Sequence, residues 1–475
     1  MAHPRIIQGG LGAGISNWQL AKAVSQTGHL GVVSGTALDS ILARRLQLGD
    51  LDGQMRRAIG QFPDRDMAQR VLETYYIPGG KMPEAPFKLV PMFTEHPRQS
   101  LLELTVVANF VEVFLAKEGH KGLVGINFLE KIQLPNLPSV YGAMLAGVDY
   151  VLMGAGIPRE IPGVLDALSE HRETSIKINI DHAKDSEHRF SFAPQSIIQT
   201  ALPPLKRPHF LAIIASVTLA LALVKKSTGK IDGFVIETPT AGGHNAPPRG
   251  VLHLDENGEP IYGPKDHVDV ARIQELGLPF WMAGSYASPE KLASVLQQGA
   301  SGIQVGTAFA FCRESGLADK IKTDFLAQLQ NDAVEVFTDP LASPTGFPFK
   351  VVKMTGMIDR ERYDARPRIC DLGYLRTAYL KPDGALGFRC PSEPEETYRD
   401  KGGAPEDTAG RKCLCNALLS NIGLAQCREG FGVEAPLITA GNDIGIIRQF
   451  LKNGRTSYSA QEVIQYLSQG NTSNA

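Results

Sequence analysis

The stretch GLPFWMAGSYASPEKLASVLQQGASGIQVGTAF, residues 277–309, contains two short apolar runs with a helical pattern between them. The first run, residues 280–283, ends in Gly-Ser, and the second, residues 302–305, ends in Gly-Thr. Apolar runs without polar alternation are typical of parallel strands that are covered on both faces. A strand, a helix and a second strand in this order predict one unit of a parallel β/α fold.

The same alternation extends through most of the chain. The candidate strands, mostly separated by helical patterns, are residues 5–8, 30–34, 122–128, 149–153, 210–216, 233–236, 280–283 and 302–305. Eight such strands predict a (β/α)8 TIM barrel, in which the carboxyl ends of the strands carry the chemistry. A doubly wound sheet is the alternative, but the glycines of residues 9–14 do not have the G-x-G-x-x-G spacing of that fold.

Two stretches do not fit a minimal barrel. Residues 175–206 precede the fifth strand and are predicted to be an insertion that includes a hairpin. Beyond residue 345 the alternation stops, and turn-rich segments mix with short helices. We therefore predict a barrel over residues 1–345 and a mostly helical or irregular module, packed on it, over residues 346–475. Ser459 and Glu462 have the spacing of a capping box and predict a helix start in that module.

The composition is that of an ordinary soluble protein. The 475 residues carry a net charge of −2, which gives no electrostatic basis for binding nucleic acid or an anionic membrane. The apolar residues 210–224 are too few for a membrane span of about 20 residues, so they are interpreted as a strand followed by a helix. The N-terminus has no signal-peptide pattern. We expect a cytoplasmic protein.

Two late strands end in loops suited to an anion. Gly284 and Ser285 follow one strand, and Gly306 and Thr307 follow the next. Glycines let a ligand approach the backbone N–H groups closely, and the two hydroxyls add hydrogen-bond donors. Two such loops on successive strands predict phosphate binding. The alternative is a pair of tight strand–helix turns.

A second glycine-rich segment follows the first strand. IIQGGLGAGIS, residues 6–16, places four glycines within a few residues of the strand's end. Without side chains this backbone can lie flat against a planar ring such as a flavin. The alternative is a flexible N-terminal turn.

A single histidine stands in the loop IETPTAGGHNAPPRG, residues 236–250. Gly242 and Gly243 remove bulk before His244, and Pro247 and Pro248 stiffen the chain after it. A rigid, exposed imidazole at the carboxyl end of a barrel strand suits a general base or acid that works near its unperturbed pKa. A role in capping the loop is the alternative.

Together these motifs resemble a known family. The runs IIQGG, VGINF, AGVDYVLMGAG, AGGH, PFWMAGS and GIQVGTAF, spread over residues 4–315, are similar to the 2-nitropropane dioxygenase-like group of FMN-dependent (β/α)8 barrels. That group includes nitronate monooxygenases and flavin-dependent enoyl-acyl carrier protein reductases.

The resemblance implies an FMN site and a role for the histidine. It places the FMN phosphate near the two late loops and the flavin ring on the backbone after the first strand, with His244 above the reactive face. There His244 takes the α-proton of a nitroalkane or orients the nitronate. The implied cofactor residues are Gln8, Gly9, Gly10, Asn127, Glu237, Gly242, Gly243, Gly284, Ser285, Gly306 and Thr307.

The chain departs from the nitronate monooxygenase pattern in the histidine loop. Glu237 stands where glutamine is common, Thr238 where glycine is usual and Thr240 where glutamate is usual. The leading hypothesis is oxidation of nitronates by O2 with His244 as base. A glutamate at position 237 looks more like the enoyl reductases, so the alternative is an NAD(P)H-dependent enoyl reductase of lipid or polyketide synthesis, with an acyl carrier protein as partner. A third hypothesis is a non-catalytic barrel subunit; a homodimer is also considered.

Five of the six cysteines lie in the last quarter of the chain. We expect Cys390, Cys413 and Cys415 to lie close together, with Cys370 or Cys427 as a fourth member. The pair Cys413 and Cys415 is placed at the N-terminal edge of a helix, which favours the thiolate form. Four thiolates would suit zinc or an iron–sulfur cluster. The alternative is a set of buried, reduced cysteines.

Overall fold

The computed structural model describes residues 3–183, 187–357, 363, 366–430 and 432–469. Within them, eight parallel strands form one sheet in the order β1-β10-β9-β8-β7-β4-β3-β2. A parallel bridge between Ile7 and Leu30 joins β1 to β2 and closes the sheet. The predicted (β/α)8 barrel is confirmed, and every strand overlaps its predicted range. The strands are β1 (Ile6–Gln8), β2 (Gly31–Ser34), β3 (Val124–Leu129), β4 (Tyr150–Gly154), β7 (His209–Ile214), β8 (Gly233–Glu237), β9 (Phe280–Ala283) and β10 (Gly302–Val305).

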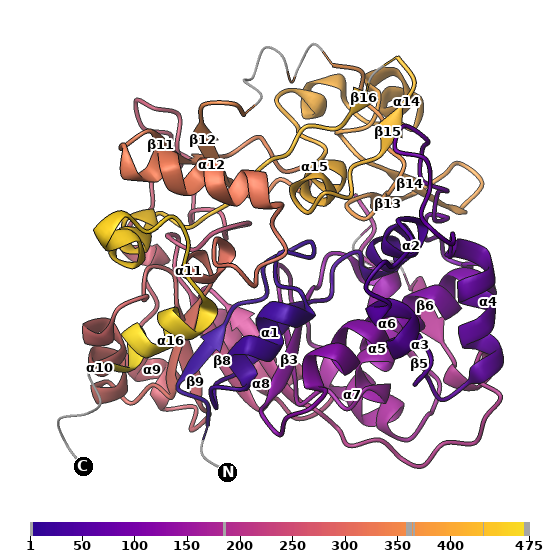
Figure 1. Cartoon of the computed structure of the whole chain (residues 1–475), viewed down its shortest axis with the longest axis horizontal. Helices are drawn as coiled ribbons and strands as arrows, with labels where there is room; N and C mark the ends of the chain where they lie inside the picture. Colours follow the sequence, from indigo (N-terminus) through magenta and orange to yellow (C-terminus); the bar gives the residue numbers. More distant parts are fainter. Residues whose placement is uncertain (1–2, 184–186, 358–362, 364–365, 431, 470–475) are drawn as a thin grey trace.

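Helices surround the strands (Figure 1). They are α1 (Trp18–Ser25), α2 (Leu38–Gln47), α3 (Gln54–Ile59), α4 (Arg65–Tyr75), α5 (Gln99–Lys117), α6 (Gln133–Leu145), α7 (Ile161–Ser169), α8 (Val217–Lys226), α9 (Val270–Gln274), α10 (Pro289–Gln297) and α11 (Thr307–Ala310). No element is predicted from the sequence where α3, α4 and α5 lie. Among the described residues, α5 is the one helix long and apolar enough to cross a membrane, and 78% of its apolar window is buried inside the protein. It packs against α1, α2 and α6.

The apolar side chains form two layers. Ile7, Leu152, Leu211, Val235 and Trp281 belong to a cluster that fills the barrel. Neighbouring strand residues belong instead to a larger cluster between the sheet and the helices. Successive side chains of a strand point to opposite faces, so each short apolar run serves both layers. This explains why the strands lack polar alternation.

The predicted insertion is a hairpin. β5 (Thr174–Lys177) pairs with β6 (Arg189–Phe192) in antiparallel register, and η1 (Pro194–Ser196) follows before β7. The insertion therefore precedes the fifth barrel strand, as predicted.

The C-terminal part of the chain, which begins with α12 at residue 319, lies above the barrel in the view of Figure 1. Its last helix, α16, is the exception, because it returns to pack beside α1 and α10. It contains antiparallel hairpins that the turn-rich sequence did not indicate, and β11 pairs with β12 across residue 345. The boundary at that residue stays a prediction. The predicted capping box of Ser459 and Glu462 is present at the start of α16. The short helix η2 (Pro264–Asp266) belongs to the barrel, in the connection from β8 to β9. The elements after the barrel are α12 (Asp319–Gln330), β11 (Val334–Asp339), β12 (Phe349–Met354), β13 (Thr377–Leu380), β14 (Leu386–Arg389), α14 (Glu395–Asp400), η3 (Pro405–Thr408), α15 (Leu414–Asn421), β15 (Cys427–Arg428), β16 (Gly432–Val433), η4 (Ile444–Gly454) and α16 (Ala460–Ser468).

Gln8 contributes to closing the barrel. Its side chain is fully buried; Oε1 accepts a hydrogen bond from the Val32 N–H at 3.0 Å, and Nε2 donates to Ser16 Oγ at 2.9 Å and to the Gly9 carbonyl at 2.5 Å. The side-chain amide therefore accepts a hydrogen bond from the backbone of β2 that no backbone carbonyl of the short strand β1 accepts. The predicted contact of a flavin with the Gln8 backbone stays a prediction, because these hydrogen bonds involve only the side chain.

We expect Gln8→Leu to lower the free energy of unfolding by about 2–4 kcal/mol, because each buried polar group left without a partner costs about 1–3 kcal/mol. The shift of the urea midpoint measures it. Gln61→Leu, a change at an exposed glutamine, is the matched control and should move the midpoint little. Equal midpoints for the two variants would contradict this role of Gln8.

Candidate active site

Two connected cavities lie at the carboxyl ends of the barrel strands. The larger has a volume of about 360 Å³ and the smaller about 120 Å³. They share the lining residues Gly10, Leu11, Asn127, Glu237 and Gly242. The larger cavity falls in the range of about 300–1,000 Å³ that small-molecule sites occupy. The C-terminal part covers it with Phe347, Tyr374, Leu414 and Thr439.

The smaller cavity brings the two predicted phosphate loops together. Gly284 and Ser285 line it from the end of β9, and Gly306 and Thr307 line it from the end of β10. Gly284 and Ser285 both have left-handed backbone, with φ of +94° and +57°. The Gly441 N–H donates to Thr307 Oγ1 at 2.8 Å, so a residue of the C-terminal part also borders this cavity.

The glycines after β1 bring the backbone close to β3. A Cβ on Gly10 would lie 2.4 Å from Asn127 Cβ, so only glycine fits there. Gly9 lines the smaller cavity and Gly10 lines both, whereas Gly243 lines only the larger one. The backbone of these glycines, which carry no side chains, forms part of the walls of the two cavities.

Two buried acceptors in this region have no hydrogen-bond partner among the described residues. They are Asn127 Oδ1 and Gln304 Oε1, and both residues line the smaller cavity. Unpartnered buried polar groups are uncommon and call for a ligand or a solvent molecule. They suit the ring N–H and phosphate-bearing chain of a flavin nucleotide, so the residues present fit FMN. Gln304 was missed by sequence reasoning, although a glutamine inside the apolar run GIQV was the available signal.

His244 lines the larger cavity and is held by residues far along the chain. Its Nε2 lies 2.7 Å from Ser343 Oγ, and its ring meets Phe349 edge-on with centroids 4.8 Å apart. The preceding Gly243 donates its N–H to Thr439 Oγ1 at 2.8 Å and accepts from the Lys350 N–H at 3.0 Å. The stiffness predicted for this loop therefore comes largely from the C-terminal part.

The environment of His244 corrects one expectation. The side chain is partly buried, not exposed. Burial and the nearby positive charge of Lys131 hold the pKa of His244 well below its usual value. The imidazole is therefore neutral at neutral pH. Sequence reasoning missed Ser343 and Phe349, for which the turn SPTGFPF gave no signal that it meets the histidine.

Glu237 lines both cavities at the end of β8. Burial raises its pKa to about 7, because a charged carboxylate loses hydration there. Its neighbour Thr238 shares a hydrogen bond with Thr240, with the two hydroxyl oxygens 2.8 Å apart. Glu237 is thus protonated over part of the neutral range and can donate a hydrogen bond into the cavities.

The cysteines converge but do not form a metal centre. Cys370, Cys390, Cys413 and Cys415 line one cavity of about 10 Å³, so the expected clustering is present with Cys370 as the fourth member. Among the described residues, however, no group of three or more His, Cys, Asp or Glu side chains is arranged to hold a metal ion. The predicted zinc or iron–sulfur site is therefore not supported.

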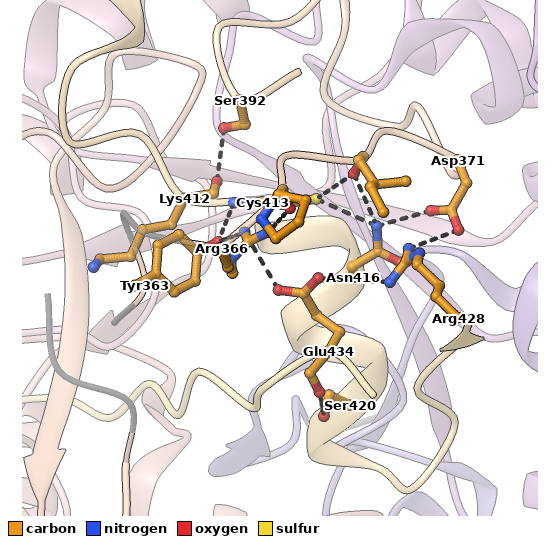
Figure 2. Close-up of polar contacts among 12 residues, drawn as sticks. Tyr363, Arg366, Asp371, Ser392, Lys412, Cys413, Asn416, Ser420, Arg428 and Glu434 are labelled. Atoms are coloured by element: carbon orange, nitrogen blue, oxygen red, sulfur yellow. Dashed lines mark hydrogen bonds and ion pairs between the residues drawn. The ribbon is translucent and has the colours of Figure 1, made fainter. Parts of the chain in front are cut away.

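Burial also reverses the expected ionisation of these thiols. Cys413 is the N-cap of α15, as predicted, yet burial raises its pKa. Its thiol donates to the Ile369 carbonyl, with sulfur and oxygen 3.9 Å apart, and Asn416 Nδ2 lies 3.4 Å from the sulfur (Figure 2). Burial raises the pKa of Cys370 to about 12. These are buried, protonated thiols, because desolvation outweighs the helix terminus.

Beside the cysteines lies a buried ionic network (Figure 2). Asn416 also donates to Asp371 Oδ1 at 2.8 Å, and Asp371 pairs with Arg428 at 2.8 Å. Arg428 and Arg366 lie 3.6 and 3.3 Å from the carboxylate oxygens of Glu434. This network joins three stretches of the C-terminal part, residues 366–371, Asn416 in α15 and residues 428–434.

With this geometry established, the chain was compared with known proteins. Residues 171–343 match the family model described as nitronate monooxygenase. This part of the chain is therefore similar to nitronate monooxygenases. The matched residues include His244, Glu237 and both late phosphate loops, and the resemblance inferred from the sequence is confirmed over them. A nitronate monooxygenase is an oxidoreductase, which agrees with the predicted class of enzyme.

One curated relative is the (3aS,4S,5R,7aS)-5-hydroxy-7a-methyl-1-oxo-octahydro-1H-indene-4-carboxyl-CoA dehydrogenase of Rhodococcus jostii (strain RHA1), 27% identical over 164 residues. The alignment covers 34% of this chain and 39% of that protein.

Two solved structures are similar over most of the chain. FabK from Thermotoga maritima has a TM-score of 0.45 at 14% identity, covering 99% of this chain and 93% of that one. The nitroalkane oxidase from Streptomyces ansochromogenes has a TM-score of 0.43 at 15% identity, covering 98% and 94%.

We expect Glu237→Gln to stabilise the ligand-free protein increasingly as pH rises from about 5 to 8. Above the ordinary glutamate pKa of about 4.3 the unfolded chain releases a proton that the folded protein keeps until about pH 7, so Glu237 destabilises the folded state across this window. Urea midpoints at pH 5 and pH 8 measure it. Glu256→Gln, in an exposed turn, controls for loss of a carboxylate. A stability difference that stays constant with pH would refute the assignment.

Proposed function

We propose that the protein is an FMN-dependent oxidoreductase in which His244 exchanges a proton with a carbon of the substrate. The observation that carries the proposal is the smaller cavity, where two phosphate-type loops and two unpartnered acceptors meet a glycine wall. It opens beside the cavity that holds His244. The backbone N–H groups of Gly284, Ser285, Gly306 and Thr307 would hold the phosphate. Asn127 and Gln304 would accept hydrogen bonds from the ring. When bound, FMN supplies hydride transfer.

For the substrate, we favour an enoyl thioester. The larger cavity is lined mainly by apolar side chains such as Leu129, Ile213, Phe347 and Leu418, and its volume of about 360 Å³ leaves room for an acyl chain. The curated relative is named for a CoA thioester, which supports the same substrate class. NADH or NADPH would provide the hydride. A cytoplasmic location and an acyl carrier protein as partner stay predictions from the sequence.

A nitronate is the second candidate. The match of residues 171–343 to the nitronate monooxygenase family favours it. In that reaction His244 would take a proton from the carbon that bears the nitro group, and O2 would be the oxidant. Both reactions require the same step from this chain: transfer of a proton at one carbon, next to a flat cofactor, in a cavity lined mainly by apolar side chains.

One set of assays separates the candidates. Purified protein should show a flavin absorption spectrum; a colourless protein that does not take up FMN would remove the proposal. Bleaching of that spectrum by NADH or NADPH, followed by recovery on addition of crotonyl-CoA, is expected for the enoyl reductase. Oxygen consumption with propyl-2-nitronate, without nicotinamide, would instead assign the second candidate.

His244→Ala should keep FMN bound but lower turnover about 10²–10⁴-fold, the usual effect of losing a general acid or base.

We expect Gln304→Leu to weaken FMN binding about tenfold, because one lost hydrogen bond of about 1.4 kcal/mol corresponds to that factor. Quenching of FMN fluorescence during titration of the FMN-free protein measures the affinity. Gln297→Leu, on the exposed face of α10, is the matched control. Unchanged affinity in Gln304→Leu would show that its amide oxygen does not meet the cofactor.

A further inference from the structure

A chain of hydrogen bonds leads from His244 to a partly buried lysine. His244 Nε2 lies 2.7 Å from Ser343 Oγ, and Ser343 Oγ lies 2.8 Å from Thr345 Oγ1. Lys131 Nζ donates to Thr345 Oγ1 at 3.1 Å. Lys131 follows β3 of the barrel, whereas Ser343 and Thr345 belong to the turn between β11 and β12. Two distant segments therefore complete one continuous path.

The bonds have a consistent direction. A lysine ammonium can only donate, so Thr345 Oγ1 is the acceptor of that bond and its own proton is available for Ser343. Ser343 Oγ accepts this proton and also the Thr345 N–H at 3.2 Å, which leaves its hydroxyl proton for His244 Nε2. In this arrangement the imidazole carries its proton on Nδ1. Within the described residues Nδ1 has no hydrogen-bond partner, and His244 lines the substrate cavity.

His244 alone is poorly suited to deliver a proton. Because burial and Lys131 keep its pKa well below the usual value, the doubly protonated ring is scarce at neutral pH. A neutral imidazole can still give up its Nδ1 proton if Nε2 receives another at the same time. The Ser343 hydroxyl is placed to provide that second proton.

Lys131 is suited to be its source. Burial lowers the pKa of Lys131 to about 7, although the negative charge of Glu130 opposes this shift, so the amine can both give and take a proton near neutral pH. Its Nζ lies 3.7 Å from the centroid of the Phe347 ring. It borders a second cavity of about 180 Å³, which also exposes Asp39, Tyr374 and Arg376. On the other side of the path, Glu237 and Cys415 are the further titratable side chains that line the cavity of His244.

We propose that Lys131, through Thr345 and Ser343, supplies the proton that His244 transfers to the substrate. The inference rests on the proposed function. In enoyl reduction, the carbon next to the thioester carbonyl takes the Nδ1 proton as the C=C π bond breaks, and a hydride that originates from NADH or NADPH, and that bound FMN would deliver, adds to the other alkene carbon. Ser343, Thr345 and Lys131 each pass one proton toward Nε2. One enoyl thioester, one NAD(P)H and one solvent proton give the saturated thioester and NAD(P)+.

Lys131 lines neither of the two cavities of the candidate active site, so it is a positioning residue that acts through His244. Four variants separate this role from charge and packing. Lys131→Met and Thr345→Val interrupt the path and should lower kcat about 10²-fold, within the range of general acid–base effects, with KM for crotonyl-CoA unchanged. Lys131→Arg keeps the charge but cannot release a proton and should not restore kcat. Thr345→Ser keeps the hydroxyl and should. Lys121→Met, at an exposed lysine, is the control.

The pH profile provides a second readout. The wild-type rate should fall as pH rises through about 7, because the neutral amine of Lys131 has no proton to give. That fall should be absent in Lys131→Met and in Thr345→Val. It should persist in Glu237→Gln, although Glu237 titrates in the same range, because the path does not include it.

A third readout is independent of turnover. In protein with ¹⁵N-labelled histidine, the ring signals of His244, identified by their loss in His244→Ala, should report the Nδ1–H tautomer and shift near pH 7. Lys131→Met should remove that shift. If the wild type reduces neither substrate, the proposed function fails while this measurement still tests the path. Full activity in Thr345→Val, restoration by Lys131→Arg, or an unshifted His244 signal in the wild type would each overturn the proposal.

Discussion

The closed ring of eight parallel strands is the constraint on which the rest of the molecule depends. An open parallel sheet leaves two edges of unpaired backbone groups, and here the β1–β2 junction removes them with the Ile7–Leu30 bridge and the side chain of Gln8. Closure places the carboxyl ends of all eight parallel strands at the same end of the barrel, around one opening. The loops after β1, β8, β9 and β10 therefore meet there, although up to about 300 residues separate them in sequence.

The barrel alone does not make the site. The C-terminal part contributes the partner of the His244 ring, the aromatic surfaces around it and the hydroxyl that holds Gly243. It also lines the cavity with apolar and aromatic side chains. Burial in this region shifts the pKa values of its titratable groups away from those of exposed groups. A low dielectric favours the neutral forms of Glu237, His244 and Lys131 together. Proton transfer among neutral groups then needs hydrogen-bonded contact, which the turn between β11 and β12 provides.

The fold was largely predictable because its signals are local. Each barrel strand is a short apolar run, mostly followed by a small residue. The capping box of Ser459 and Glu462 can be recognised from only four consecutive residues. The helix α5 gave no such signal, since it is buried nearly all round and lacks an amphipathic stripe. In the candidate site, the glycine patterns predicted that the two late loops and His244 lie at the carboxyl ends of the barrel strands, where they line the two cavities. Their electrostatics were not, because Ser343, Lys131 and the covering aromatic rings come from distant segments. For the cysteines, the sequence predicted that they lie close together. It did not predict that burial raises their pKa values and keeps the thiols protonated.

The dependence of His244 on late segments has a consequence for biosynthesis. Gly243 and Thr439 are 196 positions apart, and His244 and Ser343 are 99 apart. Since domains fold from the N-terminus as the chain leaves the ribosome, the ring of strands can form while the histidine loop still lacks its supports. A nascent barrel of this kind would already contain the glycines that line the two cavities, but it would lack the residues that fix the His244 loop. The geometry of the His244 loop is therefore completed only after residue 439 has been made.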